Sequence, residues 1–373
     1  MSAPRSVVEL LQALVRIPSV NPHGDPGGEG IVGEARIAAW LEEFLRGMGA
    51  RVELPEVLPG RPNVVAYWPG DRAGKPRVLF APHTDTVSVL GMSIAPFGGD
   101  VRDGKVWGRG ASDTKGPMAA MLWAIREMRE RLPTLGHEIW FAGLMSEEAD
   151  QHGSKALAAE ERFEFVIAAE PTGLEVVHTH KGSAFLTLRT RGKAAHASRP
   201  ELGENAITKM LNLLSWMQSE LAPEYAALRD PVLGSPTISI GTIRGGSKTN
   251  IIPDACEASV DMRFIPAQFK PGFGEALAAR LRAVCPDVEI DFPLAPPLYT
   301  DPTHPLIVKL GECGAKPVGA PWFCDACFFA ERGMPAIALG PGTIMQAHTR
   351  DEHIAVADLE KGVEFFKNFL AKL

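Results

Sequence analysis

Histidines and carboxylates that could bind metal ions follow several apolar segments of this 373-residue chain. His83 and Asp85 come directly after one such segment. The adjacent Glu147 and Glu148 come after another. Further residues of these types, at comparable places, are Asp113, Glu170 and His348. Because imidazole nitrogen and carboxylate oxygen are good zinc ligands, these residue types predict a site for divalent metal ions.

A pair of metal ions would suit this set of side chains, since an aspartate can bridge two of them. Two ions roughly 3.5–4 Å apart can share a water molecule, lower its pKa and polarise the carbonyl group that the water attacks. One carboxylate must then stay free of metal to accept a proton. Glu147 and Glu148 offer one base and one ligand, and Asp85 could orient the His83 ring. The set therefore predicts metal-assisted attack of water on a carbonyl compound.

Each of these signals taken alone has an ordinary structural explanation. A lone HxD segment is more often structural than metal-binding, a pair of glutamates usually lies on a solvated face, and His348 could be a buried histidine with its hydrogen bonds satisfied. The Gly-rich segment 108–116 could suggest a phosphate-binding loop. However, Lys115 is followed by Gly116 rather than Ser or Thr, so the P-loop spacing is not met. Only the combined order of the segments supports the metal site.

The first half of the chain alternates between helical and strand patterns. Apolar residues at helical spacing stop before Gly49, and a second helix follows Pro117. Short apolar strands are expected at 78–81, 138–144 and 165–169. Such alternation predicts a largely parallel sheet covered by helices, with a site outside the carboxyl ends of the strands. The parallel strands would therefore bring the candidate ligands together.

The pattern changes after about residue 178. A strand-helix-strand-strand-helix-strand order follows, as far as a Pro-rich segment at 293–297 that is expected to be an exit linker. This βαββαβ order predicts a small ferredoxin-like domain with four strands and two helices, inserted into a larger domain. We therefore expect a catalytic domain made of residues 1–178 and 294–373, and an inserted domain of residues 179–293.

Composition and charge exclude several function classes. Hydrophobic residues make up 45% and charged residues 22%, which is typical of a globular protein, and the net charge of -7 comes without any run of Lys or Arg. The lack of a basic face argues against a nucleic-acid partner. No apolar run reaches the roughly 18–20 residues that a membrane span needs, and the N-terminus does not resemble a signal peptide.

The five cysteines do not predict disulfide bonds. Their number is odd, and the CxxC pair of Cys324 and Cys327 lacks the second pair that a structural zinc site needs. We therefore expect reduced thiols and a cytoplasmic protein.

The order of the motifs resembles that of the dinuclear-zinc M20 family of peptidases and deacylases, the group of acetylornithine deacetylase and succinyl-diaminopimelate desuccinylase. The motifs are Ala81-Pro-His83-Thr-Asp85-Thr-Val87, Gly108-Arg-Gly-Ala-Ser-Asp113-Thr-Lys-Gly116, Ser146-Glu147-Glu148, Ala169-Glu170-Pro-Thr172 and Gln346-Ala-His348-Thr-Arg-Asp-Glu352. They are spaced over nearly the whole chain. The resemblance implies an α/β, zinc-peptidase-like catalytic domain with a mixed, largely parallel sheet, and makes the inserted domain a lid and dimerisation domain.

The resemblance also implies a role for each candidate residue at two zinc ions, which cobalt can replace. The ligands would be His83 and Glu170 for one ion, Glu148 and His348 for the other, and Asp113 for both. Glu147 would be the general base and later the proton donor to the leaving amine, and Asp85 would hold His83. The peptide bond between Asp113 and Thr114 is expected to be cis.

Segments of the inserted domain match the family as well. Gly192-Lys-Ala-Ala-His196 resembles the segment whose histidine reaches into the active site of the partner subunit and stabilises an oxyanion, which implies a homodimer through this domain. The alternative is a solvent-exposed His196. Lys248-Thr-Asn250 and Asp261-Met-Arg263 match segments that bind substrate. Arg263 would form a forked pair with the substrate carboxylate, unless it forms a salt bridge along its own strand.

Two further segments bear on the substrate. His180-Lys181-Gly182 and Leu339-Gly-Pro-Gly342 look like those of acetylornithine deacetylases, whereas the desuccinylases usually carry an Arg pair in place of His180-Lys181. Lys181 and Gly342 are therefore candidate substrate-binding residues, although the turn at Gly342 could equally be a plain surface turn. The segment Cys324-Asp-Ala326 departs from the expected Thr-Glu-Ala or Thr-Asp-Ala.

The leading hypothesis is hydrolysis of an N-acyl amino acid, a small molecule, with N-acetylornithine as the first choice. Succinyl-diaminopimelate desuccinylase and a glutamate or dipeptide carboxypeptidase are alternatives within the same family. A metal-binding scaffold without catalysis is the alternative from another class. That last reading would need a missing ligand or base, and none of these positions is empty in the sequence.

Overall fold

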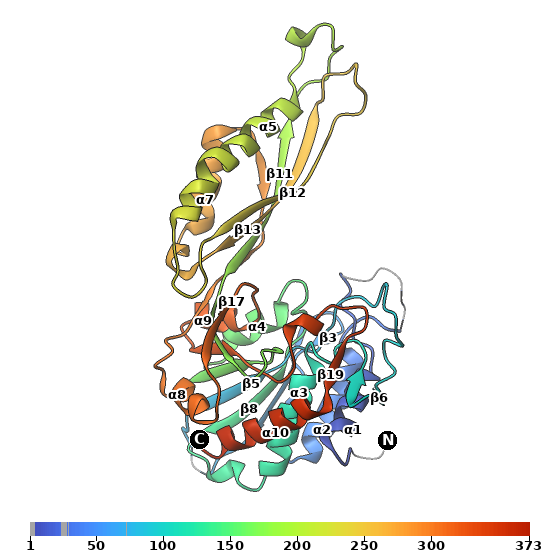
Figure 1. Cartoon of the computed structure of the whole chain (residues 1–373), viewed down its shortest axis with the longest axis vertical. Helices are drawn as coiled ribbons and strands as arrows, with labels where there is room; N and C mark the ends of the chain where they lie inside the picture. The colour runs from blue at the N-terminus through green and yellow to red at the C-terminus, as the bar shows by residue number, and fades with distance from the viewer. Residues whose placement is uncertain (1–3, 24–27, 29, 72) are drawn as a thin grey trace. The chain divides into compact units, whose positions relative to one another are not determined.

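The computed structural model describes residues 4–23, 28, 30–71 and 73–373 (Figure 1). The chain divides into two compact units. The first consists of Met1–His178, Thr300–Val318 and Cys324–Leu373, and the second of Thr179–Tyr299 and Gly319–Phe323. The predicted inserted domain, residues 179–293, lies within the second unit. Its role as a lid and dimerisation domain stays a prediction.

The first unit is built on a mixed sheet of nine strands. This count includes the strands that lie where the chain is divided between the two units. Along the sheet the nine strands are β1 (Arg51–Glu53), β4 (Val64–Trp68), β8 (Glu138–Gly143), β5 (Arg77–Ala81), β9 (Phe165–Ala168), β18 (Ala336–Ala338), β10 (Val176–His180) and β16 (Leu298–Tyr299), with β17 (Pro317–Ala320) beside β10. The central pairs β5–β8, β5–β9 and β9–β18 are parallel, and the outer pairs are antiparallel. Continuous apolar strands at the centre fit this arrangement, because helices bury both of their faces.

Helices pack on both faces of this sheet. They are α1 (Val7–Val15), α2 (Ala35–Gly47), α3 (Lys115–Met128), α4 (His152–Glu160), α8 (Pro305–Glu312), α9 (Ala326–Glu331) and α10 (Val356–Leu370). On one face α3 packs against α1 and α10, and Phe80 meets Phe366 of α10 edge to face. On the other face α4 packs against α9, which also contacts β9 and β18. The expected α/β fold is confirmed.

Two small sheets complete the first unit. One joins β19 (His353–Ala355), β7 (Lys105–Trp107) and β6 (Asp100–Arg102), and the other pairs β2 (Glu56–Leu58) with β3 (Arg61–Pro62). The first of these brings the C-terminal segment that follows His348 beside the segment that leads to Asp113. None of the helices in the described part of the chain combines the length and the apolar character that crossing a membrane requires.

The second unit follows the order β11 (Gly182–Arg191), α5 (Ala206–Trp216), β12 (Thr237–Gly245), β13 (Ala255–Phe264), α7 (Phe273–Val284) and β14 (Glu289–Asp291). A π-helical turn and the short α6 (Ala222–Ala227) follow α5. The sheet is antiparallel in the order β12-β13-β11-β14. Alternate residues of β13 are buried against α5 and α7, so one face of the sheet carries the core of this unit.

The Pro-rich segment 293–297 is not a free linker, contrary to the prediction. It contains β15 (Leu294–Ala295), which pairs with β11 and makes the sheet five-stranded. Pro293, Pro296 and Pro297 flank β15 and do not lie in it, so the pairing with β11 keeps its backbone N–H donors.

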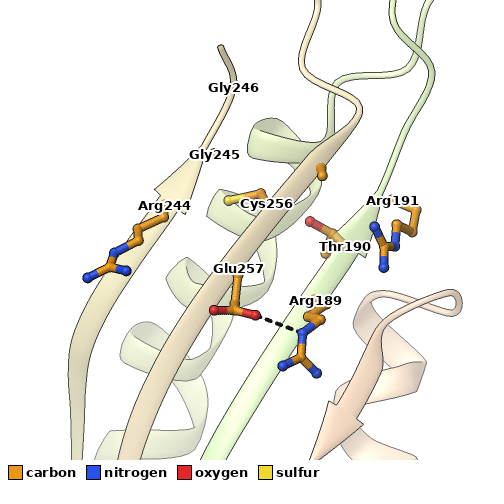
Figure 2. A pocket seen from close by; sticks show the side chains of 9 residues that line it. Arg189, Thr190, Arg191, Arg244, Gly245, Gly246, Cys256 and Glu257 are labelled. Carbon is orange, nitrogen blue, oxygen red and sulfur yellow. Dashed lines mark hydrogen bonds and ion pairs between the residues drawn. The ribbon is translucent and has the colours of Figure 1, made fainter.

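The other face of this sheet is open and carries a surface pocket of about 430 Å³, shown in Figure 2. Arg189 and Arg191 of β11 line it together with Arg244 of β12, and Glu257 lines it from β13, which lies between these two strands. Glu257 accepts a hydrogen bond from Arg189 Nε at 2.7 Å, and Glu289 accepts one from Arg191 Nε at 3.1 Å. Exposed ion pairs of this kind contribute little to stability. The pocket contains none of the predicted metal ligands.

Candidate metal centre

Three of the five predicted metal ligands, His83, Glu148 and Glu170, lie just beyond the carboxyl ends of three parallel strands. β5 ends at Ala81, β8 at Gly143 and β9 at Ala168. His83 forms a parallel bridge with Leu144, so the two strand ends stay paired past their last residues. Because parallel strands end at the same edge of a sheet, side chains that follow them converge.

Five donor residues meet there in two groups that share Asp113. The ligand atoms of His83, Asp113 and Glu170 lie within 4.8 Å of one another, and so do those of Asp113, Glu148 and His348. His83 Nε2 lies 3.1 Å from Asp113 Oδ1. On the other side, His348 Nε2 lies 3.4 Å from Asp113 Oδ2 and 3.1 Å from Glu148 Oε2. The two oxygens of Asp113 thus face the two histidines.

Asp85 is buried beneath this cluster and holds the residues around it. It accepts hydrogen bonds from the backbone N–H groups of Glu147 and Glu148 at 3.0 and 3.1 Å, and from Asn21 Nδ2 at 2.8 Å. His83 Nδ1 lies 3.0 Å from the Asp85 backbone oxygen and 3.5 Å from its carboxylate. Asp85 therefore fixes the His83 ring and the backbone of both glutamates.

The segment that carries the two glutamates is a closed loop. Asn63 bridges its ends, since Asn63 Oδ1 accepts from Met145 N–H at 3.0 Å and Asn63 Nδ2 donates to the Gly153 oxygen at 2.9 Å. Ser146, immediately before the glutamates, has a φ of 65°, and His348 has a φ of 62°. Left-handed backbone is uncommon for residues other than glycine, and such strain gathers at functional sites.

The Gly-rich segment that leads to Asp113 packs tightly under the cluster. Gly110 has a φ of +80°, and a Cβ there would lie 2.9 Å from Thr86 Cγ2. The peptide bond between Asp113 and Thr114 is cis, as expected. Thr114 Oγ1 donates to the Ala169 oxygen at 2.6 Å and so ties this segment to the residue before Glu170.

The buried carboxylates change one another's protonation equilibria. Burial, together with the charge of Glu170, raises the pKa of Glu147 well above its ordinary value, and burial with the charge of Asp113 raises the pKa of Glu170 likewise. Although burial opposes it, hydrogen bonds with His348 and His83 lower the pKa of Asp113. The hydrogen bonds with Asp113 and Glu148 raise the pKa of His348 to about 10. The site therefore disfavours the charged forms of Glu147 and Glu170, and a bound cation would offset this cost.

This donor set fits two divalent metal ions. Each group supplies one imidazole and two carboxylates, and Asp113 stands between the groups as a bridging ligand would. Three protein ligands with an open position are typical of catalytic rather than structural zinc sites. Glu147 belongs to neither group and is the carboxylate left over.

Four candidate substrate residues belong to the second unit. His196 is exposed, and its Nδ1 lies 2.7 Å from Ser198 Oγ. The Asn250 backbone oxygen accepts from the Ala197 N–H at 3.0 Å, so the His196 and Asn250 segments lie side by side. Lys181 Nζ donates to the Ser235 oxygen at 2.6 Å.

Arg263 forms the salt bridge along its own strand that the sequence left open as an alternative. Its Nε and one terminal nitrogen reach the two oxygens of Asp261 at 2.8 and 3.1 Å. The guanidinium carbon also lies 5.2 Å from the ring centre of Phe185. A forked pair with a substrate carboxylate stays a prediction, and it would have to replace the pair with Asp261.

Gly342, in the first unit, is buried and has a φ of +88°. Its backbone oxygen accepts from the Gly173 N–H at 2.8 Å, and a Cβ there would lie 3.2 Å from Ser112 Oγ. This turn therefore packs on the segment that carries Asp113.

Several residues at this centre were given no role by the sequence. Asn63, Arg109 and Glu352 hold the ligand segments through hydrogen bonds to distant backbone groups, and Asn21 does so through the Asp85 carboxylate. Asp325 is also buried, burial raises its pKa to about 7, and Ser154 Oγ donates to one of its oxygens. Glu352 lay inside a recognised motif, which was a usable signal, whereas the amides of Asn21 and Asn63 carried none.

Known proteins resemble the whole chain. A sequence model of peptidase family M20/M25/M40 matches residues 79–372. A Vibrio vulnificus protein named acetylornithine deacetylase is 29% identical, over 95% of this chain and 94% of that protein. A probable carboxypeptidase of Aspergillus oryzae is 30% identical, over 96% and 88%. The solved M20 family metallo-carboxypeptidase of Sulfolobus solfataricus has a TM-score of 0.79 at 20% identity, covering 98% of this chain and 99% of that one.

A mixed α/β sheet with a shared-carboxylate donor cluster at its strand ends defines the chain as a metal-dependent hydrolase. The chain belongs to peptidase family M20/M25/M40, since the family match spans most of its length. The family suggested by the sequence motifs is therefore confirmed.

Proposed function

We propose that the chain is a dinuclear zinc hydrolase that removes the acyl group from an N-acyl amino acid, with N-acetylornithine as the first candidate substrate. The observation that carries the proposal is the cluster of five donors around the shared Asp113, with Glu147 left over as a base. Relatives named acetylornithine deacetylase, at 29% identity over nearly the whole chain, support the choice of substrate.

Glu147 is proposed as the general base. Its backbone is fixed by the hydrogen bond to Asp85, and its carboxylate is buried beside the charges of Glu170 and His83. It would take a proton from the attacking water and later deliver it to the leaving amine. When bound, the two zinc ions supply Lewis acidity, which polarises the scissile carbonyl group and makes water more acidic.

The second unit is proposed to supply the substrate contacts within a homodimer. His196 would enter the active site of the partner subunit and donate to the developing oxyanion, where such a donor is worth about 3–4 kcal/mol. Arg263, Asn250 and Lys181 would bind the amino-acid part of the substrate. The exposure of the His196 side chain supports its role.

Two further parts of the proposal concern the metal and the compartment. Zinc suits a mixed set of imidazole and carboxylate ligands, and cobalt is expected to replace it. The compartment is proposed to be the reducing cytoplasm, which suits five cysteines that form no disulfide bond in the described part of the chain.

The proposal is tested by metal removal followed by a substrate panel. Dialysis against a chelator should abolish amide hydrolysis, and added Zn²⁺ or Co²⁺ should restore it. The restored enzyme is then assayed on N-acetyl, N-succinyl and peptidyl amino acids, compared by kcat/KM. A preference for succinyl or peptidyl substrates would overturn the deacetylase assignment, and full activity without metal would overturn the metal centre.

A carboxypeptidase is the second candidate, because the 30% identical relative is named a probable carboxypeptidase. In that case glutamate or dipeptide substrates would give the highest kcat/KM in the same panel. A scaffold without catalysis would show metal binding and no hydrolysis of any member.

A further inference from the structure

A buried ion pair, Arg109–Glu352, lies among the segments that carry the metal ligands. Arg109 NH1 lies 2.8 Å from Glu352 Oε2, and the two side chains are only 3% and 1% exposed. Neither residue belongs to the two donor groups. A buried charge pair is costly to desolvate and is kept only where its remaining hydrogen bonds are satisfied, so the partners of this pair show what it holds.

Glu352 closes the turn that ends at the shared ligand. One of its oxygens accepts from the Gly110 N–H at 2.9 Å. The other accepts from the N–H groups of Ser112 and Asp113 at 2.9 and 3.0 Å. A carboxylate accepts at both oxygens, whereas an amide of the same shape would set its NH₂ group against these donors.

Arg109 contacts two further segments that carry predicted ligands, those of His83 and His348. Its Nε and NH2 donate to the Ser88 oxygen at 3.1 and 2.9 Å, on the segment that follows His83. Its NH1 also donates to the oxygen of Thr349, the residue next to His348, at 3.3 Å. A planar guanidinium makes these contacts at once, which the single ammonium of lysine cannot do.

The local fold fixes the pair in register. Glu352 directly precedes β19, where His353 pairs with Trp107 of β7, and the Gly108 N–H donates to the Glu352 backbone oxygen at 3.0 Å. Ile354, on the same strand, is 2% exposed. The strand pairing therefore places the Glu352 side chain under the turn 108–113.

We propose that Arg109 and Glu352 are positioning residues of the metal centre, which hold Asp113 and His348 at the separation that two metal ions require. This inference rests on the metal site proposed above. Outer residues that orient ligands typically change metal affinity by 10- to 100-fold when they are replaced. If the pair served stability alone, replacing either residue would lower the melting temperature and leave the metal affinity unchanged.

The test compares metal binding by the full chain and by Glu352→Gln, each stripped of metal and titrated calorimetrically with Zn²⁺ alone. Glu352→Gln is expected to bind one of the two ions about 10- to 100-fold more weakly. The more strongly weakened ion should be that of Asp113, Glu148 and His348, because the pair contacts Asp113 and the residue next to His348 and reaches the His83 segment only at Ser88. The absorption spectrum of the Co²⁺ form should change as well, since it reports the geometry of the ligands. Arg109→Lys keeps the charge and should weaken Zn²⁺ binding and alter the Co²⁺ spectrum in the same way, but to a smaller extent.

Glu34→Gln is the matched control. It breaks an ion pair between the buried Glu34 and the partly buried Arg61, whose Nε lies 2.7 Å from Glu34; within the described residues neither side chain contacts a predicted ligand. It should lower the melting temperature without changing the Zn²⁺ affinity. Equal affinities in Glu352→Gln, Glu34→Gln and the unaltered chain would overturn the inference, and if Glu352→Gln does not fold, Arg109→Lys decides by the same comparison. An unaltered chain that binds no Zn²⁺ would instead contradict the proposed metal centre.

Discussion

The donor cluster of the first unit and the candidate substrate residues of the second are held in opposite ways. Asp85 is buried, and it holds His83 and the glutamate loop through its own hydrogen bonds. The side chain of His196 is exposed and lies beside Ser198, and Arg263 is half-exposed and paired with a neighbour on its own strand. The difference indicates that the ligands are set before metal arrives, whereas the substrate residues are free to rearrange. Segments that move on binding come from such weakly held parts.

The largest effect is expected for the proposed base, Glu147, whose replacement should change kcat but not metal affinity. Glu147→Gln keeps the size of the side chain but cannot accept a proton, so kcat should fall about 10²- to 10⁴-fold. Because Glu147 belongs to neither donor group, Zn²⁺ affinity should stay as it is. Steady-state kinetics and calorimetric Zn²⁺ titration of the same preparation measure both.

Glu160→Gln is the control for this substitution, since Glu160 is an exposed glutamate at the end of α4. It should leave both kcat and metal affinity unchanged. Near-normal turnover by Glu147→Gln would remove Glu147 from the mechanism, and a loss of Zn²⁺ together with activity would make it a ligand instead.

The next effect tests whether the second unit contributes to catalysis. His196→Ala should lower kcat about 10²- to 10³-fold, which is the usual cost of one oxyanion donor, and should leave Zn²⁺ binding intact. Ser198→Ala, which removes only the partner of the ring, is the milder matched variant. A kcat within twofold of the unaltered enzyme would show that His196 is an exposed residue without a catalytic role.

A mixing experiment sharpens this prediction. If His196 acts in the partner's site, each mixed dimer of Glu147→Gln and His196→Ala subunits has one site with both residues intact. Two inactive preparations should therefore regain activity when their subunits are exchanged. Failure to regain it, or a monomer in sedimentation, would contradict the role across the dimer.

The sequence predicted the buried strands and helices, whose apolar residues form a clear pattern. It did not predict the short strand at the edge of the second sheet. The apolar segments at 78–81 and 138–144 are β5 and β8, and the helix expected after Pro117 is α3. These elements are buried, so their apolar pattern records their environment. The Pro-rich segment at 293–297 predicts a linker, whereas Leu294 and Ala295, between its prolines, pair with β11 at the edge of the sheet.

At the site, the sequence predicted the candidate ligands and not the groups that position them. His83, Asp113 and His348 stand in recognisable motifs. Asn63 contacts backbone groups 82 and 90 residues away, and Glu352 contacts groups about 240 residues away. Such hydrogen bonds go to backbone N–H and C=O groups that every residue type offers, so they leave no pattern in the sequence.

The smallest expected effect concerns Arg263, which must leave Asp261 before it can bind a substrate carboxylate. Arg263→Lys keeps the charge and loses the fork, so KM should rise about tenfold, corresponding to the loss of roughly one charge-assisted hydrogen bond. Asp261→Asn should act in the opposite direction, because it weakens the internal pair and frees the guanidinium for substrate. Opposite shifts of KM, at similar kcat, separate a binding role from a structural one. If the pair only stabilises β13, both variants would lower the melting temperature and neither would change KM.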